Sequence, residues 1–91
     1  MEWKLFATLA ETAGEREVAL DGEAATVGEA LDALLAAHPD LEGAVLDEAG
    51  DLREHVRLLH EGEDPFRAAE GLETPVGADD ELALFPPVSG G

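Results

Sequence analysis

The stretch TVGEALDALLAAHP, residues 26–39, has the clearest pattern in this chain of 91 residues. Its apolar side chains recur at intervals of three and four residues, which places them on one face of an α-helix. They are Val27, Ala30, Leu31, Leu34 and Leu35. Thr26, with Glu29 three residues later, is a capping-box pair, and Pro39 cannot continue a helix. The sequence therefore predicts one amphipathic helix that ends at His38.

The residues before this helix have a different period. Residues 1–9, MEWKLFATL, alternate between two sides, with Lys4 and Phe6 on the side away from the core, as in a half-buried strand. Residues 17–22, EVALDG, repeat the alternation more briefly. We expect the segment ETAGERE between them to form a turn, so that the two strands pair as an antiparallel hairpin.

The residues after the helix predict two more strands. Residues 55–62, HVRLLHEG, place Val56 and Leu58 inward, and residues 81–85, ELALF, alternate in the same way. Residues 41–52 have the composition of a short helical turn followed by a loop. Residues 64–80 predict an irregular connection with a short helix or strand near Phe66.

This order of elements predicts an α+β domain over residues 1–85. A mixed sheet of four or five strands would bury its apolar face against the one main helix. Because the first strand begins near residue 1 and the last immediately precedes the tail, we expect these two strands to pair in parallel at the centre of the sheet. Residues 86–91 would form a flexible extended tail.

Acidic residues dominate the composition. The chain carries 22 Asp and Glu against one Lys and four Arg, a formal net charge of −17. At molar salt the Debye length falls to about 3 Å, so this composition suits a salt-rich cytoplasm. The acids are dispersed, which favours a solvated surface over a nucleic-acid mimic, and direct nucleic-acid binding is not expected without a basic stripe. No apolar window approaches a membrane span, so we expect a cytoplasmic protein that does not bind membranes.

The chain shows no catalytic or metal-binding pattern. There is no cysteine, which excludes disulfides, thiolate metal sites and a cysteine nucleophile. His38, His55 and His60 lack the spacing of metal ligands, and we expect His38 to interact with the end of the helix. No calcium loop or glycine-rich phosphate loop is present. On these grounds the chain holds no catalytic constellation, and we expect a monomer that binds no cofactor or metal of its own.

The tail PPVSGG, residues 86–91, is the remaining candidate site. Pro86 and Pro87 favour an extended backbone, so the tail would project on the order of 15 to 20 Å. Val88 offers one apolar anchor. Gly90 and Gly91 have no Cβ, so a terminal carboxylate could enter a narrow channel of another protein. The alternative is an unstructured end without a function.

At this point the sequence resembles a known family, the ubiquitin-like β-grasp sulfur carriers. It is similar to the small subunit of molybdopterin synthase and, more closely, to the small archaeal modifier proteins of halophiles. The resemblance covers most of the chain. Its segments are WKLFA at 3–7, ATVGEALDAL at 25–34, GLETPV at 71–76 and DELALFPPVSGG at 80–91.

The resemblance implies that the Gly91 carboxylate is a substrate, with Gly90 beside it. An E1-like enzyme would use ATP and magnesium to form an acyl-adenylate. A persulfide would then give a thiocarboxylate that supplies sulfur to a pterin precursor or to tRNA, or a lysine amine of a target protein would give an isopeptide bond. A large subunit of molybdopterin synthase would be a further partner. Tail recognition would involve Pro86, Pro87, Val88 and Ser89.

Two further expectations combine the pattern with the resemblance. Phe6 and Phe85, with Leu59 as a neighbour, would form a docking patch on the sheet face away from the helix, unless the segment 63–80 folds back over them. Lys4 is the only lysine, so it is a candidate isopeptide acceptor on that outer face, although an ordinary surface lysine is the simpler interpretation.

Three functions remain open at the level of sequence. The first is a ubiquitin-like modifier that is also a sulfur carrier. The second is a dedicated molybdopterin synthase small subunit that carries sulfur only. The third is a non-covalent acidic interaction module whose two final glycines are incidental.

Overall fold

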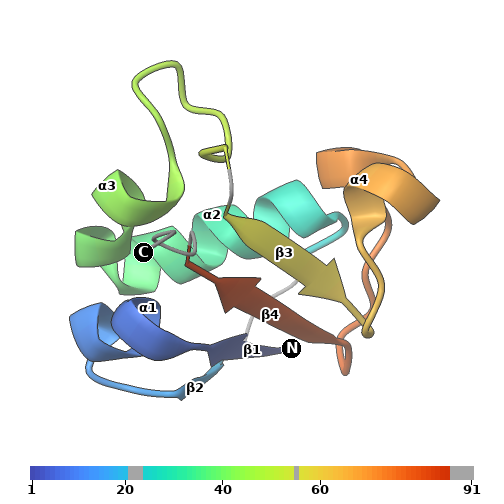
Figure 1. Ribbon diagram of the computed structural model, residues 1–91. Helices are drawn as coiled ribbons and strands as arrows, with labels where there is room; N and C mark the ends of the chain where they lie inside the picture. Colours follow the sequence, from blue (N-terminus) through green and yellow to red (C-terminus); the bar gives the residue numbers. More distant parts are fainter. Residues whose placement is uncertain (21–23, 55, 87–91) are drawn as a thin grey trace.

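Four strands form one mixed sheet in the order β2-β1-β4-β3 (Figure 1). The computed structural model describes residues 1–20, 24–54 and 56–86. The strands are β1 (Glu2–Leu5), β2 (Glu17–Ala19), β3 (Arg57–His60) and β4 (Glu81–Phe85). β1 and β4 pair in parallel at the centre, and the two outer pairs are antiparallel. The predicted parallel pairing of the first and last strands is therefore confirmed.

The main helix packs across one face of this sheet. The helices are α1 (Ala7–Ala13), α2 (Val27–Ala37), α3 (Glu42–Val45) and α4 (Pro65–Ala68), with 3₁₀ turns at Pro39–Leu41 and Gly71–Glu73. The hydroxyl of Thr26 accepts a hydrogen bond from the Glu29 N–H at 3.2 Å, and the Glu29 carboxylate accepts one from Ala25 N–H at 3.2 Å. This confirms the cap predicted at the start of α2.

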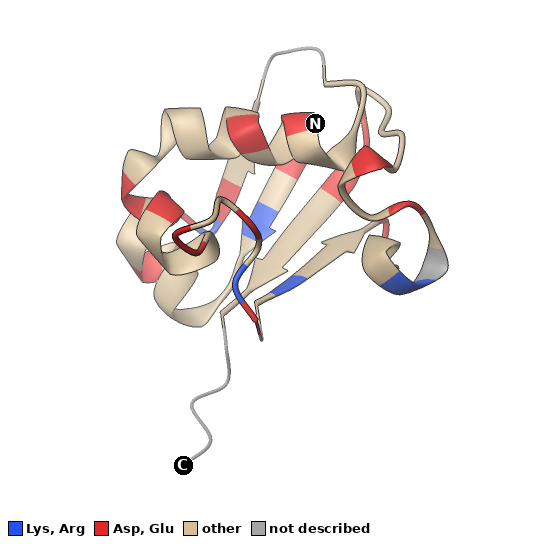
Figure 2. Cartoon of the chain, turned by 90° about the horizontal axis from the view of Figure 1, so that it is seen from above, with Lys and Arg blue, Asp and Glu red and all other residues tan. Residues whose placement is uncertain are grey.

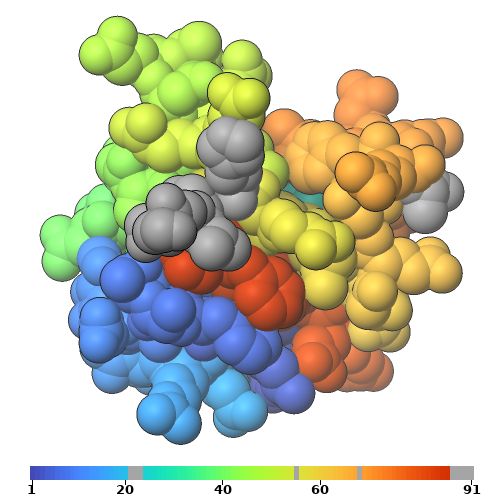
Figure 3. Space-filling model, in the orientation of Figure 1, coloured from blue at the N-terminus to red at the C-terminus, as the bar shows by residue number. Residues whose placement is uncertain are grey.

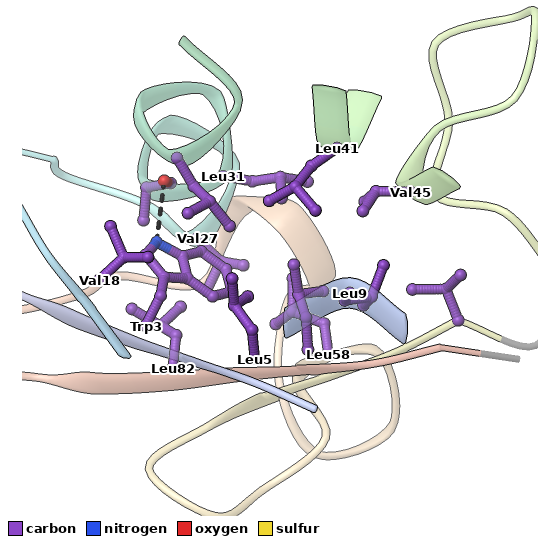
Figure 4. Close-up of a cluster of buried hydrophobic side chains, with 14 residues drawn as sticks. Trp3, Leu5, Leu9, Val18, Val27, Leu31, Leu41, Val45, Leu58 and Leu82 are labelled. Carbon is purple, nitrogen blue, oxygen red and sulfur yellow. Dashed lines mark hydrogen bonds between the residues drawn. The ribbon is translucent and has the colours of Figure 1, made fainter. Parts of the chain in front are cut away.

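The core lies between α2 and the inner face of the sheet (Figure 4). Trp3 is fully buried and is the largest side chain in it. Its indole Nε1 donates a hydrogen bond to the backbone carbonyl of Ala30 at 3.2 Å, which ties β1 to α2. Leu82 and Leu84 of β4 are also fully buried, as the alternation in ELALF predicts.

The prediction of one strand over residues 1–9 is wrong after Leu5. Phe6 is extended, Ala7 adopts a left-handed backbone with φ of 51°, and α1 begins there. The helix buries Leu9 and ends at Gly14, whose φ of 80° suits a glycine C-cap. The predicted turn within ETAGERE is thus partly helical. The prediction failed because apolar residues at positions 5 and 9 fit a strand and a strand-helix junction equally well. The antiparallel pairing of β1 and β2 is confirmed, with a helix as the connection.

The other predicted elements are present with shorter bounds. The strands expected at 17–22 and 55–62 occupy 17–19 and 57–60, and the short helical turn within 41–52 is α3. The short element near Phe66 is α4. The residues Asp21, Gly22 and His55 lie outside the described part of the chain.

Replacing Trp3 tests the packing of the sheet against α2. Trp3→Phe removes the bond to Ala30 and leaves unfilled core volume, so we expect the free energy of unfolding to fall by about 1 to 3 kcal/mol. Trp3 is the only tryptophan, so the variant has no tryptophan fluorescence to follow. Unfolding in urea is therefore measured by far-UV circular dichroism. The exposed Glu48→Gln serves as the control, with an expected change within about 0.5 kcal/mol. A loss for Trp3→Phe no larger than that of the control would contradict the role assigned to this side chain.

Candidate functional site

Two aromatic side chains meet on the outer face of the sheet. The parallel register aligns Leu5 with Leu84, so the next residues, Phe6 just after β1 and Phe85 at the end of β4, lie side by side. Their rings stack with centroids 4.3 Å apart and planes 11° apart. Phe6 is 39% exposed and Phe85 is half-buried. Their expected placement together on the face away from α2 is what the structure shows.

The third residue of the expected patch lies one strand further out. Leu59 of β3 is half-buried and pairs with Ala83, two residues before Phe85. The residue directly opposite Phe85 is Arg57, which is exposed. Analysis of the sequence missed Arg57, because its place beside Phe85 depends on the register between β3 and β4. We call Phe6, Arg57, Leu59 and Phe85 the outer-face patch.

The helical part of residues 63–80 packs at the edge of the sheet. α4 packs against the edge strand β3 and the 3₁₀ turn at Gly71–Glu73. Its aromatic residue, Phe66, lies against Gly71 and is 48% exposed. Figure 3 shows α4 (orange) at one side of the face on which β1 (blue), β4 (red) and β3 (yellow) lie next to one another.

A surface concavity of about 670 Å³ borders Phe6. It lies between β1, α1 and the start of β2, and its lining includes residues 4–7 and 14–17. Both basic and acidic side chains stand at its rim, namely Lys4, Glu11, Glu15, Arg16 and Glu17. Among the described residues, no group of three or more His, Asp or Glu side chains is arranged to hold a metal ion. The concavity is therefore lined by charged side chains, but the described residues form no cluster of metal ligands there.

Lys4 is accessible but engaged. Its ammonium lies 3.0 Å from a carboxylate oxygen of Glu81, and its side chain is 38% exposed. The hydrogen bond and the charge of Glu81 raise the pKa of Lys4 above its ordinary value. The amine of Lys4 is thus held protonated, which opposes acylation while the ion pair with Glu81 is formed. Its role as an isopeptide acceptor stays a prediction.

The start of β4 is held by a cluster of polar contacts. His60 Nε2 lies 2.7 Å from Asp80 Oδ2, and the same oxygen accepts a hydrogen bond from Gly77 N–H at 2.8 Å. The backbone carbonyl of Asp80 accepts from Glu2 N–H at 3.1 Å, and the amine of Met1 donates to the carbonyl of Ala78. These contacts align β4 with β1 and thereby determine the position of Phe85.

The other histidine contact is structural. His38 Nε2, at the end of α2, lies 3.1 Å from a carboxylate oxygen of Glu15, just after α1. His38 and His60 therefore each face a carboxylate of the same chain. The tail begins at Pro86, which is described, whereas Pro87, Val88, Ser89, Gly90 and Gly91 lie outside the described residues.

The lowered pKa of Asp80 predicts that the stability of the domain depends on pH. The hydrogen bond from Gly77 and then the contact with His60 lower the pKa of Asp80 below its ordinary value of 3.8. Its stabilising effect is therefore present above pH 3.8 and is lost as the pH falls through the lower folded-state value. Asp80→Asn should destabilise the domain most at neutral pH, and the difference from the unaltered protein should shrink in acid. Thermal unfolding between about pH 2 and 7 measures this, since the loss occurs below pH 3.8. A difference that is constant over that range would contradict the role of the Asp80 charge.

Comparison with known proteins gives consistent matches. The ThiS family is matched over residues 3–91. Small archaeal modifier protein 1 of Haloferax volcanii is 55% identical over 92 aligned residues, which cover the whole of both chains. A crystal structure of that protein has a TM-score of 0.88 at 54% identity and covers 100% of this chain and 98% of its own.

A more distant match comes from a complex. One chain of the crystal structure of the Amycolatopsis orientalis BexX/CysO complex is 27% identical with a TM-score of 0.81, covering 99% of this chain and 98% of that chain.

The described part of the chain contains no helix of the length and apolarity needed to cross a bilayer. The α+β β-grasp fold predicted from the sequence is confirmed.

Proposed function

The chain belongs to the ThiS family of ubiquitin-like modifiers and sulfur carriers, and from this membership we propose that its Gly91 carboxylate is activated and transferred. In this proposal the chain is both a protein modifier and a sulfur carrier, and it is a substrate rather than an enzyme. The observation that carries the proposal is the alignment with small archaeal modifier protein 1, which extends through the whole of both chains.

Activation is the step that a free carboxylate requires. A carboxylate is a poor electrophile, so an E1-like enzyme would bind ATP with magnesium and let the Gly91 carboxylate attack the α-phosphorus. Pyrophosphate leaves, and an acyl-adenylate forms. ATP and magnesium belong to the enzyme in this scheme.

The adenylate can then react in two ways. A lysine amine of a target protein attacks the Gly91 carbonyl, AMP leaves, the nitrogen loses a proton, and an isopeptide bond results. Alternatively, the terminal sulfur of a persulfide displaces AMP to give an acyl disulfide. A second thiolate attacks the other sulfur, forms a disulfide with it and releases the thiocarboxylate. The thiocarboxylate would supply sulfur to a pterin precursor, with the large subunit of molybdopterin synthase as the partner, or to tRNA.

Removing the two final glycines tests the proposal in cells. We expect an antibody against the folded domain to detect a ladder of high-mass conjugates in cells that produce the unaltered chain. Deleting Gly90 and Gly91 should abolish the ladder, because it removes the reacting group. A variant with one alanine added after Gly91 is the matched control. It keeps both glycines but moves the terminal carboxylate from Gly91 to the alanine, so it should abolish the ladder too.

Two results would count against the proposal. Conjugates that persist in both variants would show that Gly91 is not the site of linkage. An absence of conjugates from the unaltered chain, with sulfur transfer that depends on Gly90 and Gly91, would favour the strict sulfur carrier.

The outer-face patch is the proposed docking surface for the E1-like enzyme and for a molybdopterin synthase large subunit. Support comes from the exposed stack of Phe6 on Phe85, since an exposed aromatic pair next to the exit of the tail can anchor a partner. The same stack would orient the tail, because Phe85 is only one residue from Pro86.

Truncating the aromatic pair tests this docking role. Phe6→Ala and Phe85→Ala should each weaken binding of the E1-like enzyme at least about tenfold. The loss of stability should stay near 0.5 to 1.5 kcal/mol, the size of one aromatic pair. Phe66→Ala is the matched control, because Phe66 is the other exposed phenylalanine and lies on α4. Equal affinities for all three variants, measured by calorimetry, would remove the patch from the proposal.

A further inference from the structure

Like the other three arginines, Arg57 is exposed and forms no ion pair with the described residues, but it is the one arginine that lies on a described strand of the sheet. The molecule carries 22 acidic residues, yet among residues 1–20, 24–54 and 56–86 none forms an ion pair with Arg57. The other cation on the sheet, Lys4, is held by Glu81 at 3.0 Å. Arg57 is therefore an exposed guanidinium whose charge is available to another molecule.

The position of Arg57 ties it to the aromatic stack. It is the Cα partner of Phe85 in the antiparallel pair of β3 and β4. Directly opposed residues of an antiparallel pair point to the same face of the sheet, so the Arg57 side chain stands on the face of Phe85. Leu59, two residues along β3, shares that face. A protein that covers Phe6 and Phe85 must therefore also meet Arg57.

Covering this guanidinium requires a matching group on the partner. Removing a charged side chain from water is unfavourable unless hydrogen-bond acceptors replace the water. No carboxylate of the described chain reaches Arg57, so the acceptor has to come from the partner. A carboxylate fits best, because the planar guanidinium can donate two parallel hydrogen bonds to its two oxygens.

The charge of the rest of the molecule makes this position selective. With a net charge of −17, most of the surface disfavours an acidic partner. Figure 2 shows basic segments on two strands of the sheet, on α4 and in loops, and more numerous acidic segments over helices, loops and strand ends. A partner carboxylate is therefore accommodated next to Arg57 and opposed at most other places. Short-range pairing of this kind also remains effective where salt screens long-range attraction.

We propose that Arg57 is a specificity residue of the outer-face patch, pairing with a carboxylate of the E1-like enzyme whose apolar surface covers Phe6 and Phe85. The inference rests on the proposed function for the identity of the partner. Arg57 acts in recognition and has no part in the chemistry at Gly91.

The experiment measures the affinity of the E1-like enzyme encoded in the same genome for a set of variants of the full-length chain. Arg57→Glu reverses the charge, and Arg57→Gln keeps most of the length without it. Arg67→Glu is the matched control, because Arg67 is an exposed arginine on α4 and also has no ion pair with the described residues. Binding is measured by calorimetry without ATP, at molar KCl. A second series lacks Gly90 and Gly91, and unfolding curves confirm that each variant folds.

We expect Arg57→Glu to raise the Kd by about 30-fold or more, Arg57→Gln by about tenfold, and Arg67→Glu by less than about twofold. The same ranking should hold in the series without the glycines, because recognition by Arg57 does not use the carboxylate of Gly91. If Gly91 were not activated while the ranking held, the proposed function would fail and the role of Arg57 would stand.

Results of three kinds would overturn the inference. The first is an affinity of Arg57→Glu within twofold of the unaltered chain, or no binding of the unaltered chain at all. The second is an equal loss for Arg67→Glu, which would indicate a general effect of net charge. The third is a dimer in sedimentation that Arg57→Glu dissociates, which would assign this face to a second copy of the chain.

Discussion

The parallel pairing of β1 with β4 is the constraint on which the rest of the structure depends. Parallel strands place their carboxyl ends at the same edge of a sheet, so residues 79 positions apart in the chain lie together at that edge. The register of Leu5 with Leu84 then makes Phe6 and Phe85 neighbours, and their rings stack at 4.3 Å. An antiparallel pairing would have put them at opposite edges. The start of the tail is therefore fixed beside an aromatic pair by backbone geometry alone.

Much of this arrangement could be predicted from the sequence because it follows from local periodicity. The spacing of leucines in 26–38 requires α2, and the alternation in ELALF separates Leu84 from Phe85. The helix α1 could not be predicted in the same way, since its junction depends on a left-handed backbone at Ala7, a conformation that alanine seldom adopts. Arg57 was missed for a different reason. Its neighbour across the sheet is set by pairing between distant strands, and one sequence does not show which residues pair.

The domain divides its tasks between a stable interior and a surface that acts only through partners. Trp3 and the leucines of β4 hold the sheet to α2, while the polar contacts of Asp80 hold β4 in register. The described residues contain no assembled metal-ligand cluster. What they present instead is an aromatic pair, an unpaired arginine and a last strand that leads into the tail. In the proposed function, this surface selects a partner and the partner carries out the bond-making steps at Gly91.

The most direct test of this account is to trap the activated carboxylate. The purified chain would be incubated with the E1-like enzyme, magnesium-ATP and hydroxylamine, which converts an acyl-adenylate to a hydroxamate. Trypsin then releases residues 68–91 as one peptide, since Arg67 is the last basic residue of the chain. The account predicts an ATP-dependent hydroxamate on Gly91 of this peptide. An unmodified peptide 68–91, with the enzyme shown to be active on another substrate, would contradict it.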